Sequence, residues 1–293
     1  MIYIDGRKYG SSIQGAIGTH DPNKVWMEQG CLFVDGSIDL MHGTKVFAPI
    51  RAWSVWCFPD VEVHGDVTCY DAFRTEGRAA IHGWIRAPRI FLGHNVSVRG
   101  GLVTPLDGGQ VHCGNNCFVN GTLETMEFRC GDGFRAEALV RCARGFVGNN
   151  FVSTGRIEVW DSLMAGAQCQ LLGSNYVERL MTRDMLTING GDYGEIHSDD
   201  QFASHGSIYC RKLIVDNTPR VHGDIPSARG CAGTGHQHST CARRHPRQRV
   251  HQVWRLGLHT GQRPLWGTRR ERAGPTHRRG DISTRVARYP TVE

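Results

Sequence analysis

Residues 63–102 contain three copies of one short pattern, VHGDV at residues 63–67, IHGWI at residues 81–85 and VRGGL at residues 98–102. Each copy has a glycine at its centre and an apolar residue two positions away on either side. The copies follow one another at intervals of 18 and 17 residues. A pattern that returns at a fixed interval of this length indicates a repeat architecture, in which similar units stack on one another.

The same pattern recurs along most of the chain. From Gly65 to Gly223 the intervals stay close to 17 residues, and one interval of 34 is two periods with a copy that lacks glycine near Ala138. A four-residue insertion in the turn-rich segment 103–109 accounts for one longer interval. The expected repeat glycines are Gly15, Gly36, Gly65, Gly83, Gly100, Gly121, Gly155, Gly173, Gly190, Gly206 and Gly223.

The segments between the glycines alternate apolar and polar residues, as in residues 124–128 and 156–159. This period of two predicts strands. Gly-Asn-Asn at residues 114–116 and 148–150 suits corners, because these residues accept left-handed backbone angles. We therefore predict an all-β fold, a single-stranded three-faced β-solenoid (β-helix) with coils of about 17 residues. About nine coils are expected from Gly65 to Gly223, and roughly twelve in the whole array.

Two segments differ sharply in composition. Residues 1–225 form the predicted repeat array, of which residues 1–59 are less regular. Residues 226–293 hold 14 Arg, no Lys and three acidic residues, so this tail carries +11 while the array carries −5. We expect a disordered, basic tail rich in Arg, His, Pro and Gly. Its composition is typical of GC-rich DNA read out of frame, which leads to the hypothesis that the tail is a frameshift product.

Binding of nucleic acid and binding of zinc are two other interpretations of the tail. Its arginines, with Trp254 and Trp266, are residue types that bind phosphates and stack on bases, but no nucleic-acid-binding module is recognisable. Zinc binding would use cysteine and histidine ligands, whose spacing here matches no zinc signature. The residues concerned are Cys231, His236, His238, Cys241 and His245. We expect no metal and no cofactor, and no nucleic-acid partner for the array.

A stack of coils leaves an open strand edge at each end, which a cap or another subunit must cover. The aromatic segment 52–58 interrupts the repeat pattern. The favoured interpretation is ordinary core within an irregular coil, and a cap or a contact is the alternative. The candidate assembly contacts are Trp53, Trp56, Phe58, Val221 and Ile225.

Residues 77–100 and 206–225 resemble the repeat of the bactofilins, which are bacterial polymer-forming cytoskeletal proteins. Both segments contain Gly-x-Ile, followed by an apolar strand and by an apolar-x-Gly-x-apolar copy one coil later. The resemblance covers residues 60–225 and, more loosely, residues 1–59. It implies a right-handed β-helix that assembles end to end without nucleotide.

We therefore expect a non-enzymatic, self-assembling cytoskeletal scaffold whose main partner is a second copy of itself. No apolar stretch is long enough to span a membrane and no signal peptide is evident, so we expect a cytoplasmic protein. Peripheral contact with a membrane or with the cell-wall machinery is compatible with this class. The alternative is a β-helical carbohydrate-active or phage-fibre-like binding module, which predicts acids and aromatics aligned along a surface groove.

Histidines precede two neighbouring repeat glycines, as His64 and His82, and again as His205 and His222. These side chains should point outward and stack about 5 Å apart. Two stacked imidazoles are able to share a metal ion or to repel each other when protonated. Arg99 continues the first row, which favours an exposed polar ladder over a dedicated histidine site.

Most cysteines stand singly among apolar residues. We expect them to be reduced, buried thiols that pack as small hydrophobic side chains. The residues are Cys69, Cys113, Cys117, Cys130, Cys142, Cys169 and Cys210.

Overall fold

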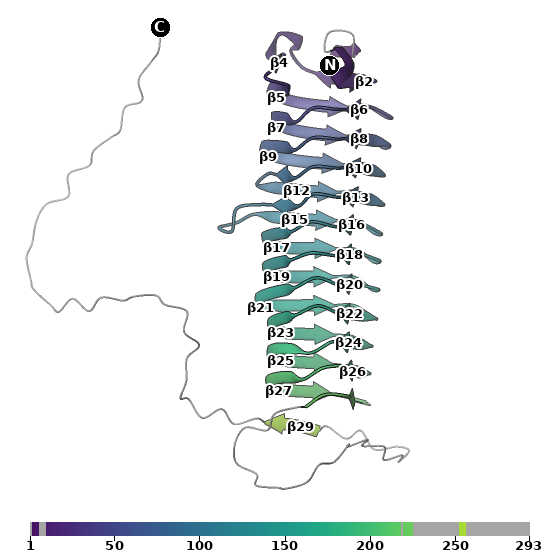
Figure 1. Cartoon of the computed structure of the whole chain (residues 1–293), viewed down its shortest axis with the longest axis vertical. Helices are drawn as coiled ribbons and strands as arrows, with labels where there is room; N and C mark the ends of the chain where they lie inside the picture. The colour runs from purple at the N-terminus through teal and green to yellow at the C-terminus, as the bar shows by residue number, and fades with distance from the viewer. Residues whose placement is uncertain (1, 6–9, 218, 225–251, 256–293) are drawn as a thin grey trace, which may run out of the picture. The chain divides into compact units, whose positions relative to one another are not determined.

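The structure is a computed structural model that describes residues 2–5, 10–217, 219–224 and 252–255. Within these residues the chain winds through successive, similar coils that stack into a β-solenoid (Figure 1). The described residues contain no α-helix; short 3-10 turns lie at residues 10–12 and at Pro22–Lys24 (η2). The predicted all-β solenoid with coils of about 17 residues is therefore confirmed.

Each coil contributes to three faces. Face 1 is a twelve-stranded sheet whose strands pair in parallel from β6 onward. Its strands are β2 (Ile13–Gln14), β6 (Lys45–Val46), β8 (Val61–Val63), β10 (Ala79–Ile81), β13 (Val96–Val98), β16 (Phe118–Val119), β18 (Arg135–Ala136), β20 (Val152–Ser153), β22 (Cys169–Leu171), β24 (Leu186–Ile188), β26 (Phe202–Ser204) and β28 (Pro219–Val221).

Faces 2 and 3 belong to one seventeen-stranded sheet, because most of its strands bend at a corner and cross both faces. In β17 (Leu123–Cys130) the first residues pair with β14 on face 2, and the last four pair with β15 on face 3. The other strands are β1 (Ile2–Asp5), β3 (Ala16–Thr19), β4 (Val25–Glu28), β5 (Cys31–Leu40), β7 (Ile50–Cys57), β9 (Val67–Thr75), β11 (Ile85–Arg86), β12 (Arg89–Leu92), β14 (Leu102–Val103), β15 (Gln110–Cys113), β19 (Val140–Val147), β21 (Ile157–Ala165), β23 (Asn175–Thr182), β25 (Gly191–Ser198), β27 (Ile208–Val215) and β29 (Gln252–Arg255).

The register of face 1 reproduces the predicted period. Val63 pairs with Ile81, Ile81 with Val98 and Val98 with Val119. From β6 to β28 there are eleven parallel strands and hence eleven coils, rather than roughly twelve, because β2 lies antiparallel on β6. The predicted insertion separates β14 from β15 and forms the loop that projects from the stack in Figure 1.

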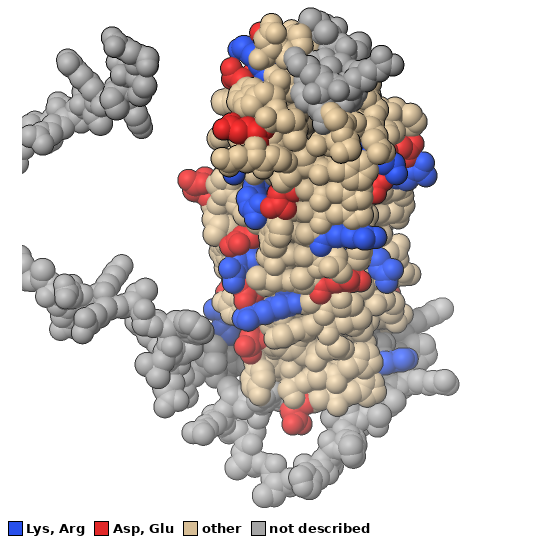
Figure 2. Space-filling view, turned by 45° about the horizontal axis from the view of Figure 1, so that its top comes forward, with Lys and Arg blue, Asp and Glu red and all other residues tan. Residues whose placement is uncertain are grey.

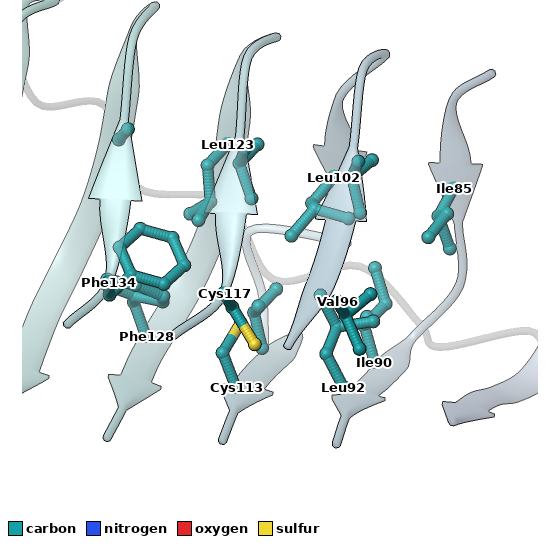
Figure 3. Packing of buried hydrophobic residues seen from close by; sticks show 14 of the residues in the cluster. Ile85, Ile90, Leu92, Val96, Leu102, Cys113, Cys117, Leu123, Phe128 and Phe134 are labelled. Atoms are coloured by element: carbon teal, nitrogen blue, oxygen red, sulfur yellow. The ribbon is translucent and has the colours of Figure 1, made fainter. Parts of the chain in front are cut away.

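Inward side chains of successive coils stack into apolar columns. Figure 3 shows Ile85, Leu102 and Leu123 in one such column, and all three are fully buried. Phe134 packs between Phe128 and Phe151, with ring centroids 5.0 and 6.0 Å away. Burying one such side chain contributes about 1.5–3 kcal/mol. Most of these contacts join neighbouring coils, so the stability of a coil depends on the coils beside it.

An antiparallel strand covers each face of the first coil. On face 1, β2 pairs with β6; on face 2, β4 pairs with the first part of β5; on face 3, β3 pairs with its last part. β1 in turn pairs with β3. We call β1 to β4 the N-terminal cap, and Figure 1 shows β4 and β2 above β5 and β6.

The strand pairing near the N-terminus corrects two expectations. The parallel repeat begins at β5 and not before the expected first repeat glycine, Gly15, since β1 to β4 all pair antiparallel. Residues 52–58 do not interrupt the repeat, because β7 pairs in parallel with β5 and with β9 like any other coil. The sequence pattern of this segment misleads because Trp53 and Trp56 occupy outward positions, while Ala52, Val55 and Cys57 fill the core.

The C-terminal end differs from the capped end. On face 1 the last strand is β28, and no further strand pairs with it among the residues that the structure describes. On face 3, β29 pairs antiparallel with the last part of β27. Apart from β29, the expectations for the tail (disorder, a shifted reading frame, zinc or nucleic acid) concern residues outside the described part of the chain.

Candidate functional site

The repeat glycines from Gly65 to Gly223 occupy the corner between faces 1 and 2. A Cβ on Gly83 would overlap the carbonyl oxygen of Gly65, and a Cβ on Gly173 would overlap that of Gly155. At this corner the backbones of neighbouring coils approach so closely that a side chain would push them apart, which favours glycine here. Ala138 holds the same position in the copy that lacks glycine.

Gly15 and Gly36 lie outside this column, which corrects their assignment as repeat glycines. Gly15 connects β2 to β3 in the N-terminal cap and has φ +118°. Gly36 lies within β5, between faces 2 and 3, where the register with β7 shifts, and has φ +138°. Both are glycines because of this backbone conformation. The apolar-x-Gly-x-apolar pattern therefore does not distinguish a stacked corner from a bulge.

The candidate assembly contacts lie at opposite ends of the array. Trp53 is 57% exposed and Trp56 is 41% exposed, both on the second coil. The ring of Phe58 stacks on that of Trp56, with centroids 5.9 Å apart. Val221 belongs to the last strand of face 1 and packs against the core, and Ile225 lies outside the described residues.

The last strand of face 1 presents backbone groups outward. The N–H of His222 donates a hydrogen bond to the carbonyl of Ser204 in the preceding coil, at 2.9 Å. Because N–H groups alternate in direction along a strand, the N–H and C=O of Val221 point away from β26. Within the described residues nothing pairs with this edge of β28. Such an edge is able to accept another strand.

A row of stacked rings runs along the outer surface of face 1. His64 lies between Phe47, 4.7 Å away, and His82, 4.4 Å away at an interplanar angle of 3°. His205 and His222 also stack, 5.6 Å apart at 2°. The predicted stacking of both histidine pairs is confirmed.

A carboxylate that was not predicted from the sequence, that of Glu62, lies beside His64 and His82. Glu62 Oε1 lies 2.9 Å from His64 Nε2 and 3.3 Å from His82 Nε2. Lys45 Nζ lies 2.9 Å from the other carboxylate oxygen, and its hydrogen bond holds the pKa of Glu62 below its usual value. The spacing of Glu62 and His64, two residues apart on one strand, places both side chains on the outer surface. That spacing was the only available signal.

A second group of possible ligands, His197, Asp199 and Asp216, is more exposed. His197 Nε2 lies 3.4 Å from Asp199 Oδ1, and these side chains are 42% and 53% exposed. Ligands this open to water gain little preorganisation from the fold.

A shallow groove crosses face 2 near its C-terminal half. Arg141 joins Glu124 and Glu158 in a ladder across three coils, at 3.4 and 2.8 Å. Trp160 and Tyr176, which lie beside this ladder of charges, are each more than 40% exposed. The groove is lined by Arg156, Glu158, Trp160, Ser174, Asn175, Tyr176 and Asp192. Acids and aromatics do line up here, as the binding-module alternative predicts.

Charges of both signs are interspersed on the surface drawn in Figure 2, where basic and acidic side chains lie next to one another. Several ion pairs join adjacent coils, such as those of Arg78 with Asp60 and of Arg179 with Asp161. No extended basic area is visible on the face drawn in Figure 2. Exposed pairs of this kind contribute little to stability, because water screens their charges.

The described cysteines are free thiols. Burial raises the pKa of Cys69, Cys142 and Cys169 to about 12. Cys117 differs, because a hydrogen bond involving the Cys113 thiol lowers its pKa. Thiols with raised pKa values are poor nucleophiles and poor metal ligands. For the fully buried cysteines this geometry agrees with the predicted packing role.

Comparison of the chain with protein-family models, curated proteins and solved structures gives no significant match. Among the described residues, no helix has the length and apolar character needed to cross a membrane.

Proposed function

We propose that this chain is a non-enzymatic structural protein whose β-solenoid associates with other copies through its C-terminal end. The proposal rests on a difference between the two ends of the array, namely how many of their strand edges are covered by another strand. Each face of the first coil has an antiparallel strand over it, whereas β28 has no strand beyond it among the described residues. Antiparallel strands of this kind protect natural solenoids from edge-to-edge pairing. At the C-terminal end β29 covers only face 3, so the uncovered edge of β28 on face 1 is the expected place for assembly.

The organisation of the polar surface supports a scaffold. Many ion pairs join one coil to the next, as in the ladder of Glu124, Arg141 and Glu158. They reinforce the stacking that the apolar core already provides. A stiff column with a regular surface is suited to positioning other molecules.

A cytoskeletal polymer of the bactofilin kind is the finer form of this proposal. A polymer needs a contact at both ends, and the N-terminal cap leaves only short antiparallel strands there. The contact at that end would therefore use side chains. Trp53 and Trp56 are exposed on the second coil, with Phe58 stacked on Trp56, and Trp26 of β4 is an exposed aromatic in the cap itself. A cytoplasmic location, and peripheral contact with a membrane or the cell-wall machinery, belong to the same proposal.

Electron microscopy of the purified full chain, without nucleotide or metal, tests the polymer. Filaments or sheets that disappear in the double variant Trp53→Ala/Trp56→Ala would support it. If only dimers form, assembly is limited to the C-terminal end and the polymer is contradicted. If the protein is monomeric at every concentration, both the association through the C-terminal end and the polymer are contradicted.

The groove on face 2 favours a second candidate, a β-helical binding module for carbohydrates. Trp160 and Tyr176 offer ring faces and Glu158 and Asp192 offer hydrogen-bond acceptors for sugar hydroxyls. Binding of soluble polysaccharides to the full chain, lost in Trp160→Ala and retained in Trp53→Ala, would support this function.

A further inference from the structure

We propose that Glu62, His64 and His82 form a binding site for a divalent transition-metal ion such as Zn²⁺ on the outer surface of face 1. The three residues come from two successive coils, so the site exists only when β8 and β10 are stacked. It adds a ligand-binding property to the scaffold and does not depend on whether the protein assembles.

The donor atoms already have a spacing close to that of a metal site. Glu62 Oε1 lies 2.9 Å from His64 Nε2 and 3.3 Å from His82 Nε2. Tetrahedral zinc, with bonds of about 2.0–2.1 Å, separates its ligand atoms by roughly 3.3 Å. Small movements of the three side chains would therefore place one ion among them, with water as the fourth ligand.

The chemistry of the donors suits the same ions. Imidazole nitrogens with one carboxylate oxygen bind zinc and other late first-row metals, and are a poor set for Ca²⁺ or Mg²⁺. His82 Nε2 is buried, and although Glu62 Oε1 lies 3.3 Å away, no described group makes a hydrogen bond of good geometry to it. A buried polar nitrogen without a partner is unusual, and a metal ion would satisfy it.

The neighbouring residues keep the ligands together. Phe47 stacks on His64 at an interplanar angle of 17° and keeps that ring beside His82. Lys45 contacts Glu62 through the oxygen that faces away from the histidines, and so orients the carboxylate as outer-shell partners do in metal sites. The two histidine rings are parallel, so each must turn about its Cβ–Cγ bond, a soft torsion, for the lone pairs to converge.

The chain contains its own control for this site. His205 and His222 stack in the same way on two later coils, 5.6 Å apart. Ala203 stands two residues before His205, where the first pair has Glu62. The second pair has the two imidazoles without the carboxylate, so it should bind a metal ion much more weakly.

Titration of the full chain with Zn²⁺, followed by calorimetry and repeated with Co²⁺ by visible absorption, tests the proposal. All variants keep the cysteines and histidines of residues 226–293, so their contribution cancels in the comparison. We expect His64→Ala/His82→Ala to lose one equivalent of bound metal, and Glu62→Gln to bind that equivalent at least about tenfold more weakly. His205→Ala/His222→Ala should leave it unchanged, and Ala203→Glu should add an equivalent.

These side chains lie on the outer surface, so their substitution should leave the fold intact. Circular dichroism of each variant reports whether it does. Glu62→Gln is nearly isosteric and keeps the proposal testable if the double alanine variant unfolds. Equal zinc stoichiometry and affinity in the wild-type chain and in Glu62→Gln would overturn the proposal. The same loss of metal from His205→Ala/His222→Ala as from His64→Ala/His82→Ala would overturn it as well.

Discussion

Gly173 lies directly against the carbonyl oxygen of Gly155 in the preceding coil, so closely that a Cβ on Gly173 would overlap this oxygen. The relationship repeats at most coils along the same corner. Because this contact recurs once per coil, the interval between successive glycines gives the length of a coil.

The first prediction follows from that corner. Gly173→Ala should destabilise the fold by about 1–3 kcal/mol, because a methyl group forces the two backbones apart. The lower part of this range is favoured, because Ala138 is accommodated at an equivalent position. Urea unfolding measures the change. Gly77→Ala is the matched control, since its Cβ would lie 3.6 Å from Pro59, and the prediction is wrong if both variants lose the same stability.

The fold was largely predictable, because the spacing of the glycines reflects the stacking of the coils. Of the candidate site, only the stacked histidine pair was predictable. Gly65, Gly83 and Gly100 define the coil because the backbone contact at their corner recurs once per turn. The N-terminal cap has no such signal, because antiparallel strands of residues 2–28 follow no period. Glu62 and His64 lie two residues apart in one coil, but His82 joins them only through stacking between coils, which no motif within one coil displays.

Asp71 provides a prediction about pH. A hydrogen bond from Arg89 in the next coil lowers the pKa of Asp71. A carboxyl group with a lowered folded-state pKa stabilises the fold above its unfolded pKa, and this contribution is lost as the pH falls through the folded value. Asp71→Asn should therefore cost about 0.2–1 kcal/mol at pH 7, and the difference from wild type should shrink toward pH 3. Unfolding by urea at both pH values measures it.

The control for Asp71 is Asp107→Asn, which removes a carboxylate from the projecting loop. We expect little change in stability at either pH. A difference between wild type and Asp71→Asn that stays constant from pH 7 to pH 3 would rule out the ion pair as its cause.

Buried thiols give a prediction about reactivity. Because burial raises the pKa of Cys142 and Cys169 to about 12, their thiolate fraction near pH 8 is roughly a thousandfold below that of an unperturbed cysteine. Iodoacetamide should leave both unmodified in the native protein and modify both in urea, as peptide mass spectrometry would show. Rapid native alkylation of Cys142 would mean that the coil around it opens.

The edge of β28 is the centre of the proposed assembly, and Val221 offers a direct way to change it. Its N–H points away from the preceding coil, so Val221→Pro removes an outward donor without removing a hydrogen bond inside the array. Val221→Thr keeps the donor and the branched shape, and serves as the control. Thermal unfolding of both variants should stay close to wild type.

Sedimentation equilibrium of the full chain and these two variants, over a wide range of concentrations, tests the central claim most directly. Self-association of the wild-type chain and of Val221→Thr, with a monomeric Val221→Pro variant, is the result that assembly through the C-terminal end predicts. A wild-type chain that stays monomeric throughout, or a Val221→Pro variant that associates as strongly as wild type, would contradict it.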